Sequence, residues 1–328
     1  SSSTAAVVKT NAYGLGVDVV VPALEQAGAN FFYVAQFDEA LTLRQYTQKP
    51  IAVLGGLAHG SATDYQHHKI IPVLNSAVDI ERCPATLPSI WHIDTGMNRL
   101  GLSPSDVATL ASRAASLPIL MMTHFASSND INNHFSHEQV RRFDEAIAAA
   151  PKPFHSLPQS ICNSSGIFRN STWHRAQVRA GIALYGGNPT PETTNPMQSV
   201  VTLEAKILQI RHVKASETAG YNQTYTFPKN TTIATVGLGY ADGILRAGSN
   251  TAQFYWRGQP CPIVGCISMD LIMVDIGQLT VPAPQQDDWL EILGSHQSVD
   301  QLSVDLGLIS YEVLTSLSRR ATRLTTKI

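Results

Sequence analysis

Lys9, near the start of the chain, has the surroundings of a reactive amine. It closes an apolar run at 5–9 and is followed by the segment TNAYGLG. Burying an unpaired cation is costly, so two interpretations stand. Either the side chain reaches out to solvent, or it is a desolvated amine with a lowered pKa, suited to Schiff-base chemistry. A position at the end of a barrel strand, where such folds keep their catalytic groups, favours the second interpretation.

The cysteines and histidines predict no metal site. Cys261 and Cys266 are five residues apart, without the tight pairing of a zinc knuckle, and we expect them in the core. The run from His134 to His137 has no second cluster, which favours a solvated helix start. Four cysteines in 328 residues do not make a disulfide framework. We therefore expect a reducing compartment, the cytoplasm.

Composition excludes several classes of protein. The chain is 44% hydrophobic and 15% charged, which argues against disorder. Its net charge of −2 suggests neither a nucleic acid nor a membrane surface as a partner. No apolar run approaches the roughly 20 residues of a bilayer span. The chain starts without methionine and enters a strand almost at once. We therefore expect further residues upstream that complete the β domain.

Up to residue 190 the sequence alternates strand-like and helix-like segments. Helical spacing predicts helices at 17–27, 105–117 and 137–150, and Asp38 and Ser105 are predicted N-caps. Eight strand candidates in this region predict an eight-stranded, TIM-like α/β barrel rather than an open sheet. These candidates are 5–9, 31–35, 51–54, 70–74, 89–94, 119–124, 159–162 and 180–185.

The pattern changes at about residue 190, and we expect domains at 1–190 and 191–328. The segment PTPETTNP is typical of a linker. Runs rich in Val, Ile and Thr follow, with a turn at Arg257-Gly258, and predict a mostly antiparallel β domain with a short helical end from Ser298. These runs are 201–213, 231–239, 252–256, 262–275 and 289–293.

The segment around Lys9 resembles the pyridoxal-phosphate signature of the alanine racemase family, in which the lysine carries the cofactor. Further segments resemble the family in the same order, over nearly the whole chain. They are DTGMNRLG (94–101), THFA (123–126), NS (163–164), RAGIALYG (179–186), GYADG (239–243) and SMD (268–270). The resemblance implies a pyridoxal 5'-phosphate enzyme that interconverts L- and D-alanine and supplies D-alanine for peptidoglycan. It also implies a head-to-tail homodimer with shared active sites.

Racemisation needs a proton taken from one face of the α-carbon and returned to the other, which two bases on opposite faces achieve. The resemblance implies that Lys9 serves one face and that Tyr240, from the partner subunit, serves the other. Tyrosine is a poor base at its ordinary pKa of about 10. Tyr240 therefore needs a hydrogen-bonded or cationic neighbour, and the family pattern offers His124. The alternative for Tyr240 is an aromatic residue packed into the β domain.

The resemblance also implies how the substrate and the pyridine ring are held. Arg99 would hold the substrate carboxylate or the cofactor phenolate, to which a guanidinium can make two parallel bonds, and the backbone N–H of Met269 would be a second contact to the substrate carboxylate. A solvent-facing Arg99 and a core Met269 are the alternatives. Arg179 would face the pyridine nitrogen, and because it only donates hydrogen bonds it would keep that nitrogen unprotonated and the ring a weaker electron sink. The alternative for Arg179 is a surface salt bridge.

The remaining cofactor contacts follow from the same resemblance. Tyr13, Ser164 and the backbone N–H groups of Gly181 and Ile182 would bind the phosphate. Gly181 permits a close backbone approach, and barrels often place phosphate near their last strands. His124 would lie against the cofactor ring.

Five positions depart from the commonest family pattern. Leu15 and Ser160 stand where histidines are usual, and the latter histidine supports the pyridine-facing arginine. His92 stands where some members have a lysine that supports the substrate arginine. Arg319 aligns with a tyrosine on the phosphate and channel, and Cys266 replaces an entrance arginine. These changes leave the cofactor chemistry intact but widen the expected substrates to serine or other small amino acids.

Two other functions make different demands on the chain. A barrel-type amino-acid decarboxylase requires an acidic group at the pyridine nitrogen and a glycine-rich phosphate loop. Arg179 argues against this function. A non-enzymatic pyridoxal-phosphate carrier of this barrel type lacks the β domain, and the length of the chain argues against it.

Overall fold

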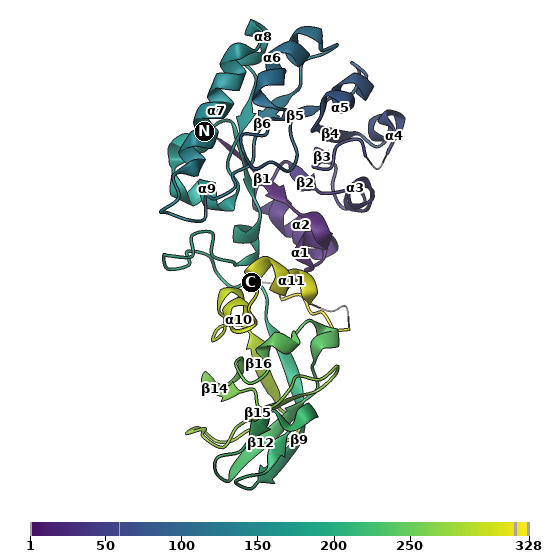
Figure 1. The fold of residues 1–328 in the computed structure, drawn as a ribbon. Helices are drawn as coiled ribbons and strands as arrows, with labels where there is room; N and C mark the ends of the chain where they lie inside the picture. Colours follow the sequence, from purple (N-terminus) through teal and green to yellow (C-terminus); the bar gives the residue numbers. More distant parts are fainter. Residues whose placement is uncertain (1, 59, 318–319, 327–328) are drawn as a thin grey trace. The chain divides into compact units, whose positions relative to one another are not determined.

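The computed structural model describes residues 2–58, 60–317 and 320–326, and it divides into two compact units (Figure 1). Unit 1 consists of Ser1–Leu184 and Asn188–Pro196, and unit 2 consists of Tyr185–Gly187 and Met197–Ile328. The irregular segment PTPETTNP therefore folds with unit 1, where Glu192 forms an ion pair with Arg169.

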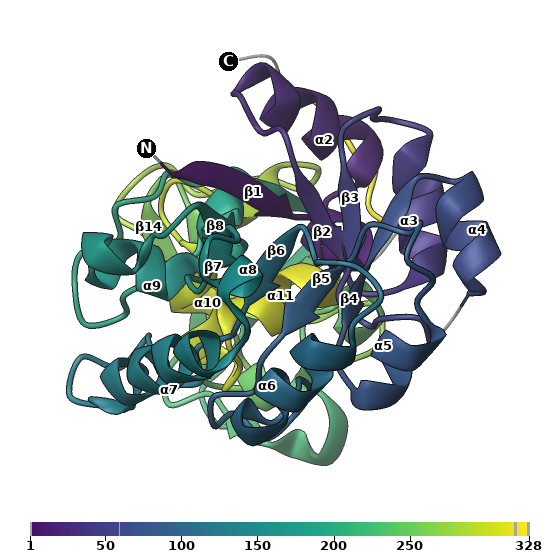
Figure 2. The ribbon, with the colours of Figure 1, turned by 90° about the horizontal axis from the view of Figure 1, so that it is seen from above.

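Unit 1 is a parallel barrel. Its strands follow the order β7-β6-β5-β4-β3-β2-β1-β8. The Ala176 N–H donates to Gln159 O and the Arg179 N–H donates to Cys162 O, and these bonds join β8 to the β7 segment. The helices lie outside the strands (Figure 2), and the predicted eight-stranded barrel is confirmed. The strands are β1 (Ser3–Val7), β2 (Phe32–Val34), β3 (Ile51–Val53), β4 (Ile70–Leu74), β5 (Ile90–His92), β6 (Leu120–Met122), β7 (Gln159–Ser160) and β8 (Gln177–Ala180).

The helices of unit 1 follow the strands, as the sequence predicts, but both predicted N-caps are wrong. The N-cap of the third helix is Gln36, whose backbone N–H donates to the Glu39 side chain. The N-cap of the sixth helix is Ser103, because Pro104 favours the first helical position. The helices are α1 (Lys9–Tyr13), α2 (Val17–Gln26), α3 (Phe37–Arg44), α4 (Ala62–His67), α5 (Ala77–Arg82), α6 (Pro104–Arg113), α7 (Phe135–Ala149), α8 (Lys152–His155) and α9 (Ser164–Arg169).

The last barrel strand differs from the prediction of 180–185. It spans Gln177–Ala180, and Ile182–Tyr185 forms a 3-10 turn. This strand is hard to recognise in the sequence because it contains polar residues, two of which point into the barrel interior. Gln177 accepts the Tyr33 hydroxyl at 2.7 Å, and Arg179 is 3% exposed. Arg179 therefore belongs to the strand instead of preceding it.

Unit 2 is built on a six-stranded antiparallel sheet, as predicted, in the order β14-β13-β16-β9-β12-β15. Arg257 and Gly258 both have positive φ, +49° and +79°, which suits the two-residue turn between β13 and β14. The predicted strand 262–275 is wrong, because the chain turns at Gly265 (φ +80°) and pairs again only from Ile272. The strands are β9 (Leu203–Val213), β12 (Thr231–Val236), β13 (Gln253–Trp256), β14 (Gln259–Pro262), β15 (Ile272–Asp275) and β16 (Trp289–Leu293).

Smaller elements complete unit 2. A short pair, β10 (Thr218–Ala219) and β11 (Tyr225–Thr226), lies apart from the main sheet in the pairing order. Two helices, α10 (Val299–Asp305) and α11 (Ser310–Ser316), form the expected helical end, with Ser298 as an N-cap. Among the helices of the described residues, none is both long and apolar enough to cross a bilayer.

Candidate active site

Lys9 begins a left-handed turn directly after β1. The strand ends at Val7, so Lys9 lies two residues beyond it and not at its last position. The next four residues, Thr10 to Tyr13, all have φ between +52° and +56°. Left-handed backbone costs a non-glycine residue roughly 1–2 kcal/mol. Such strain persists only where surrounding contacts enforce it, and it is common at functional sites.

Glu39 is the main group that enforces this turn. Its carboxylate accepts the backbone N–H of Thr10, and it also accepts those of Ala35 at 2.7 Å and Gln36 at 3.1 Å. Asn11 contributes by accepting the Val17 N–H at 3.0 Å. No motif in the sequence indicated Glu39. Its place three residues into α3 was the available signal, because that position commonly caps a helix.

Burial lowers the pKa of Lys9, the positive charge of Arg99 lowers it further, and Glu39 opposes the shift. A lysine whose pKa is lowered carries a larger fraction of neutral amine, which is the form that attacks a carbonyl carbon and accepts a proton. The half-buried position of Lys9 therefore supports the reactive-amine interpretation of this residue over the solvent-facing one.

Arg179 is a buried cation surrounded by hydrogen-bond acceptors. One of its terminal nitrogens donates to Ser160 O at 3.0 Å and to Ser160 Oγ at 2.6 Å, and the other donates to Thr123 O at 2.6 Å. Arg179 is buried, and in the part of the chain that the structure describes it forms no salt bridge. The alternative interpretation of Arg179 as a surface salt-bridge residue is therefore wrong. Ser160 contacts the guanidinium directly through its hydroxyl.

We expect Arg179→Met to destabilise the barrel by about 1–3 kcal/mol, because buried Thr123 O would lose the guanidinium donor, whereas Ser160 O still accepts the Thr123 N–H. Arg179→Lys should cost less, since an ammonium still donates three hydrogen bonds. Urea unfolding of the purified variants measures both. A methionine variant as stable as the lysine variant would contradict this account.

His124 has a defined tautomer. Its Nδ1 atom lies 3.4 Å from the Arg179 guanidinium, which only donates, so Nδ1 accepts and the ring proton is on Nε2. Burial and the positive charges of Arg179 and Arg99 hold the pKa of His124 well below its usual range. His124 is therefore neutral at neutral pH. His124, which the sequence offers as the neighbour of Tyr240, would therefore assist that tyrosine by donating a hydrogen bond and not as a cation.

His92 has the opposite tautomer. The Asn75 amide nitrogen donates to Leu54 O and Val73 O, both at 2.9 Å, so Asn75 Oδ1 is the atom that faces His92 Nδ1 at 2.8 Å. His92 Nδ1 must therefore carry the proton, and Nε2 carries a lone pair. Burial and the Arg179 charge lower the pKa of His92 to about 4, against the opposing effect of Asp94.

We expect His92 to remain neutral down to about pH 4 and to make the fold acid-sensitive. The unfolded chain binds this proton near pH 6.5, so stability is complete above pH 6.5 and is lost between pH 6.5 and about 4. The loss is on the order of 3 kcal/mol. Nuclear magnetic resonance of ¹³C-labelled histidine, assigned with His92→Gln, should show no titration of His92 above pH 5. Titration near pH 6.5 would contradict the expectation.

Tyr13, Ser164 and Gly181 converge at the end of β8. The Gly181 N–H donates to Ser164 Oγ at 2.8 Å, and the Ala183 N–H lies 3.4 Å from the same oxygen. A Cβ atom at Gly181 would lie 2.6 Å from the Tyr13 hydroxyl oxygen, so only glycine allows this approach. The Tyr13 and Ser164 hydroxyls and the backbone N–H groups that follow β8 are donors suited to a phosphate dianion. Ile182, also predicted, follows Gly181 and is 2% exposed.

Arg99 is an exposed residue on the loop that follows β5. Asp94 shapes this loop by accepting the backbone N–H groups of Gly96 at 2.9 Å and Asn98 at 3.1 Å. The charge of Arg99 lowers the pKa values of Lys9 and His124, so the guanidinium lies within electrostatic reach of both.

Tyr240 and Met269, both in unit 2, are neighbours through their backbones. The Tyr240 N–H donates to Ser268 O at 3.0 Å, and the Ala241 N–H donates to Met269 O at 3.1 Å. Gly239 makes this possible, because a Cβ there would lie 2.2 Å from Met269 O. Tyr240 is 39% exposed and Met269 is 52% exposed. Met269 is therefore not a core residue, and more than a third of the Tyr240 surface is open to solvent.

The remaining predicted positions are structurally plain. Cys266 is buried with its sulfur 3.3 Å from Thr224 Oγ1, and Cys261 is fully buried. All four cysteines are free thiols. Within residues 2–58, 60–317 and 320–326, no group of three or more His, Cys, Asp or Glu side chains is placed to hold a metal ion. Arg319 lies outside the described residues.

These features define an α/β-barrel protein that has a lysine beyond the carboxyl end of β1 and a separate β unit. The lysine and the neighbouring donors form a site suited to binding a cofactor. Residues 1–189 match the family described as "Alanine racemase, N-terminal domain", and residues 200–325 match "Alanine racemase, C-terminal domain". The chain belongs to the alanine racemase family.

Named relatives agree with this assignment. The alanine racemase of Methylobacterium nodulans is 42% identical over 97% of this chain and 88% of its own, and that of Rhodospirillum rubrum is 41% identical over 98% and 88%. A crystal structure of alanine racemase from Bartonella henselae with covalently bound pyridoxal phosphate has a TM-score of 0.91 at 37% identity, covering 98% of this chain and 92% of that one.

Proposed function

We propose that this protein is a pyridoxal-phosphate-dependent racemase that interconverts L- and D-alanine, with Lys9 and Tyr240 as the two bases. The observation that carries the proposal is the strained turn that holds Lys9, an amine with a lowered pKa, in a barrel whose buried Arg179 supplies only hydrogen-bond donors. The family assignment and the cofactor in the Bartonella henselae relative support the same reaction.

The residues present fit the cofactor. Tyr13, Ser164 and the backbone N–H groups of Gly181 and Ile182 would hold its phosphate, where the close contact at Gly181 leaves no room for a side chain. Arg179 would face the pyridine nitrogen and keep it unprotonated, because a guanidinium has no proton-accepting atom and stays charged. His124, in contact with Arg179, would lie against the ring. Bound pyridoxal phosphate supplies the electron withdrawal that makes the α-proton of an amino acid removable.

The proton transfers belong to Lys9 and Tyr240. Lys9 attaches the cofactor and exchanges a proton with one face of the α-carbon, while the Tyr240 hydroxyl exchanges a proton with the other face. Arg99 and the Met269 N–H hold the substrate carboxylate, and the guanidinium supplies charge as well as direction. An unprotonated pyridine nitrogen limits electron withdrawal, which suppresses side reactions such as transamination.

Assembly and location are part of the proposal. Residues 1–190 bind the cofactor and 191–328 supply Tyr240 to the partner subunit of a head-to-tail homodimer. The exposure of Tyr240 and Met269 on one loop pair of unit 2 supports this arrangement. The four free thiols support a reducing compartment, the cytoplasm, where D-alanine for peptidoglycan is made. Neither a nucleic acid nor a membrane is proposed as a partner.

The purified protein with pyridoxal phosphate should absorb in the visible and interconvert L- and D-alanine. A panel of amino acids including serine establishes whether alanine is preferred, since Ser160, His92 and Cys266 depart from the usual pattern. Carbon dioxide release from a basic amino acid without racemisation would favour a decarboxylase. A cofactor-loaded protein that never exchanges the α-proton of alanine in heavy water would be a carrier.

A further inference from the structure

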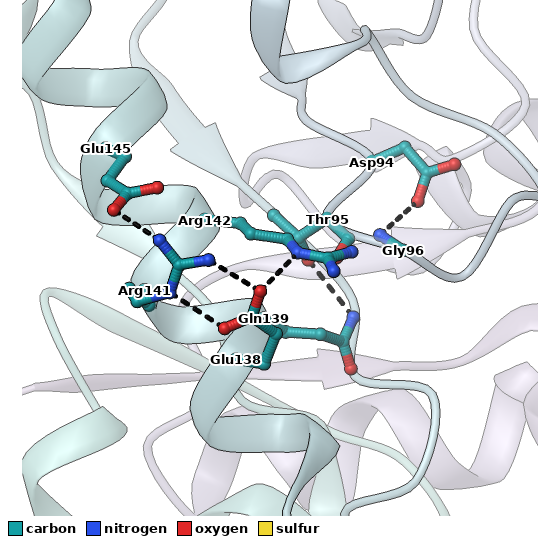
Figure 3. Close-up of polar contacts among 8 residues, drawn as sticks. All are labelled: Asp94, Thr95, Gly96, Glu138, Gln139, Arg141, Arg142 and Glu145. Carbon is teal, nitrogen blue, oxygen red and sulfur yellow. Dashed lines mark hydrogen bonds and ion pairs between the residues drawn. The ribbon is translucent and has the colours of Figure 1, made fainter.

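Gln139, on α7, is a fully buried polar residue that the proposed chemistry does not use. Its side chain bonds to two separate loops of the barrel. The Ala126 N–H donates to Gln139 Oε1 at 2.9 Å, and Gln139 Nε2 donates to His124 O at 2.9 Å and to Thr95 Oγ1 at 3.1 Å. One amide group therefore joins the loop after β5, which carries Arg99, to the loop after β6, which carries His124. Figure 3 shows the contact with Thr95 of the first loop.

The orientation of this amide follows from its partners. A backbone N–H only donates and a backbone carbonyl only accepts, so Oε1 must face Ala126 and Nε2 must face His124. The network continues inward from Thr95, whose hydroxyl lies 2.8 Å from that of Thr123, and Thr123 O accepts from Arg179. Apart from Ala126, which is exposed, these residues are buried or half-buried, where an unpaired polar atom is costly.

A second, independent contact seats the Arg99 loop on the same helix. Gly96 has φ +130°, and a Cβ there would lie 2.5 Å from Phe135 Cζ and 2.9 Å from Arg142 Nη1. Arg142 also donates to Thr95 O at 3.3 Å and is itself held by Glu138 at 2.8 Å (Figure 3). The loop therefore packs against α7 with no room for a side chain at position 96.

We propose that Gln139 is a positioning residue that sets the substrate-binding Arg99 loop and the His124 segment relative to each other. The assignment of Arg99 and His124 to substrate and cofactor rests on the proposed function, whereas the seating of both loops rests only on the contacts above. Gln139 touches neither reacting atoms nor cofactor in this scheme. It acts by holding two loops that come from different strands.

Hydrogen exchange tests the seating without reference to activity. Gln139→Met fills similar volume but bonds to neither loop, so exchange should accelerate about tenfold or more in both 94–101 and 123–127 of the cofactor-loaded enzyme. Gly96→Ala should accelerate exchange in 94–101 and leave 123–127 unchanged, because it disturbs only the seat of the first loop. Glu145→Gln is the matched control, since Glu145 is an exposed residue of α7 whose carboxylate pairs with Arg141 of the same helix.

Kinetics provides the functional measurement. A displaced Arg99 weakens carboxylate binding before it affects proton transfer, so the KM for alanine should rise about tenfold in Gln139→Met and Gly96→Ala, with a smaller change in kcat. The dissociation constant of propionate, a carboxylate without the amine, should rise in parallel. Gln139→Glu should raise KM less than the methionine variant, because its carboxylate still accepts the Ala126 N–H but cannot donate to His124 O.

The outcomes separate clearly. Faster exchange in both segments together with a raised KM, and an unchanged Glu145→Gln enzyme, supports the proposal. A Gln139→Met enzyme that is merely less stable, with wild-type exchange in both segments and a wild-type KM, overturns it. If the wild-type protein does not racemise alanine, the proposed function fails, while the exchange measurements still decide whether Gln139 seats the two loops.

Discussion

Lys9→Ala should leave a folded protein that holds no covalently attached pyridoxal phosphate and racemises alanine at least about 10⁴-fold more slowly than the wild type. The alanine side chain removes both the amine that attaches the cofactor and the base for one face of the substrate. The strained turn should persist, because the Glu39 carboxylate holds it through the backbone of Thr10 and not through Lys9.

Borohydride reduction followed by peptide mass spectrometry measures the attachment directly. In the wild type the mass of the reduced cofactor should appear on the peptide that contains Lys9. Lys49→Ala is the control, since Lys49 is an exposed lysine of the same unit. Retention of racemisation by Lys9→Ala, or a wild-type adduct on another lysine, would remove Lys9 from the proposed mechanism.

Tyr240→Phe should lower racemisation about 10³-fold while exchange of the α-proton of one enantiomer persists. The substitution removes only a hydroxyl, and Tyr240 is anchored through its backbone N–H to Ser268 O, so the loop geometry should survive. Lys9 still exchanges a proton on its own face, and nothing remains to serve the other. Tyr255→Phe is the control, a tyrosine of β13 whose hydroxyl accepts from Gln253.

Heavy-water exchange, measured separately for L- and D-alanine, distinguishes this result from general damage. Equal loss of exchange for both enantiomers would argue against two bases. Mixing Lys9→Ala and Tyr240→Phe subunits should then restore part of the activity, because one site of each heterodimer would contain both bases. No restoration, with subunit exchange confirmed, would contradict a site shared between subunits.

The sequence predicted the wholly apolar strands of the barrel well and misplaced the last strand, which carries two polar side chains. The runs at 51–53 and 70–74 are buried strands that read as continuous apolar segments. The strand Gln177–Ala180 escaped detection because Gln177 and Arg179 find their partners, Tyr33 and Ser160, on distant segments. A local pattern cannot show that a polar residue is satisfied by a residue far along the chain.

The site divides in the same way. Local motifs identified Lys9, Tyr13, Ser164 and Gly181, and the structure brings the last three together. Glu39 and Gln139 were missed. Each bonds to one residue 29 or more positions away, Glu39 to Thr10 and Gln139 to Thr95, and no spacing rule within one helix reveals those two contacts.

By itself the sequence determined which chemical groups the protein has and the order of the segments that carry them, because residue type and short-range periodicity are properties of the chain alone. The tertiary structure decided the left-handed turn after β1, the tautomers of His92 and His124, and the seating of the Arg99 loop on α7. Those features depend on hydrogen-bond partners and packing distances between segments that only folding brings together.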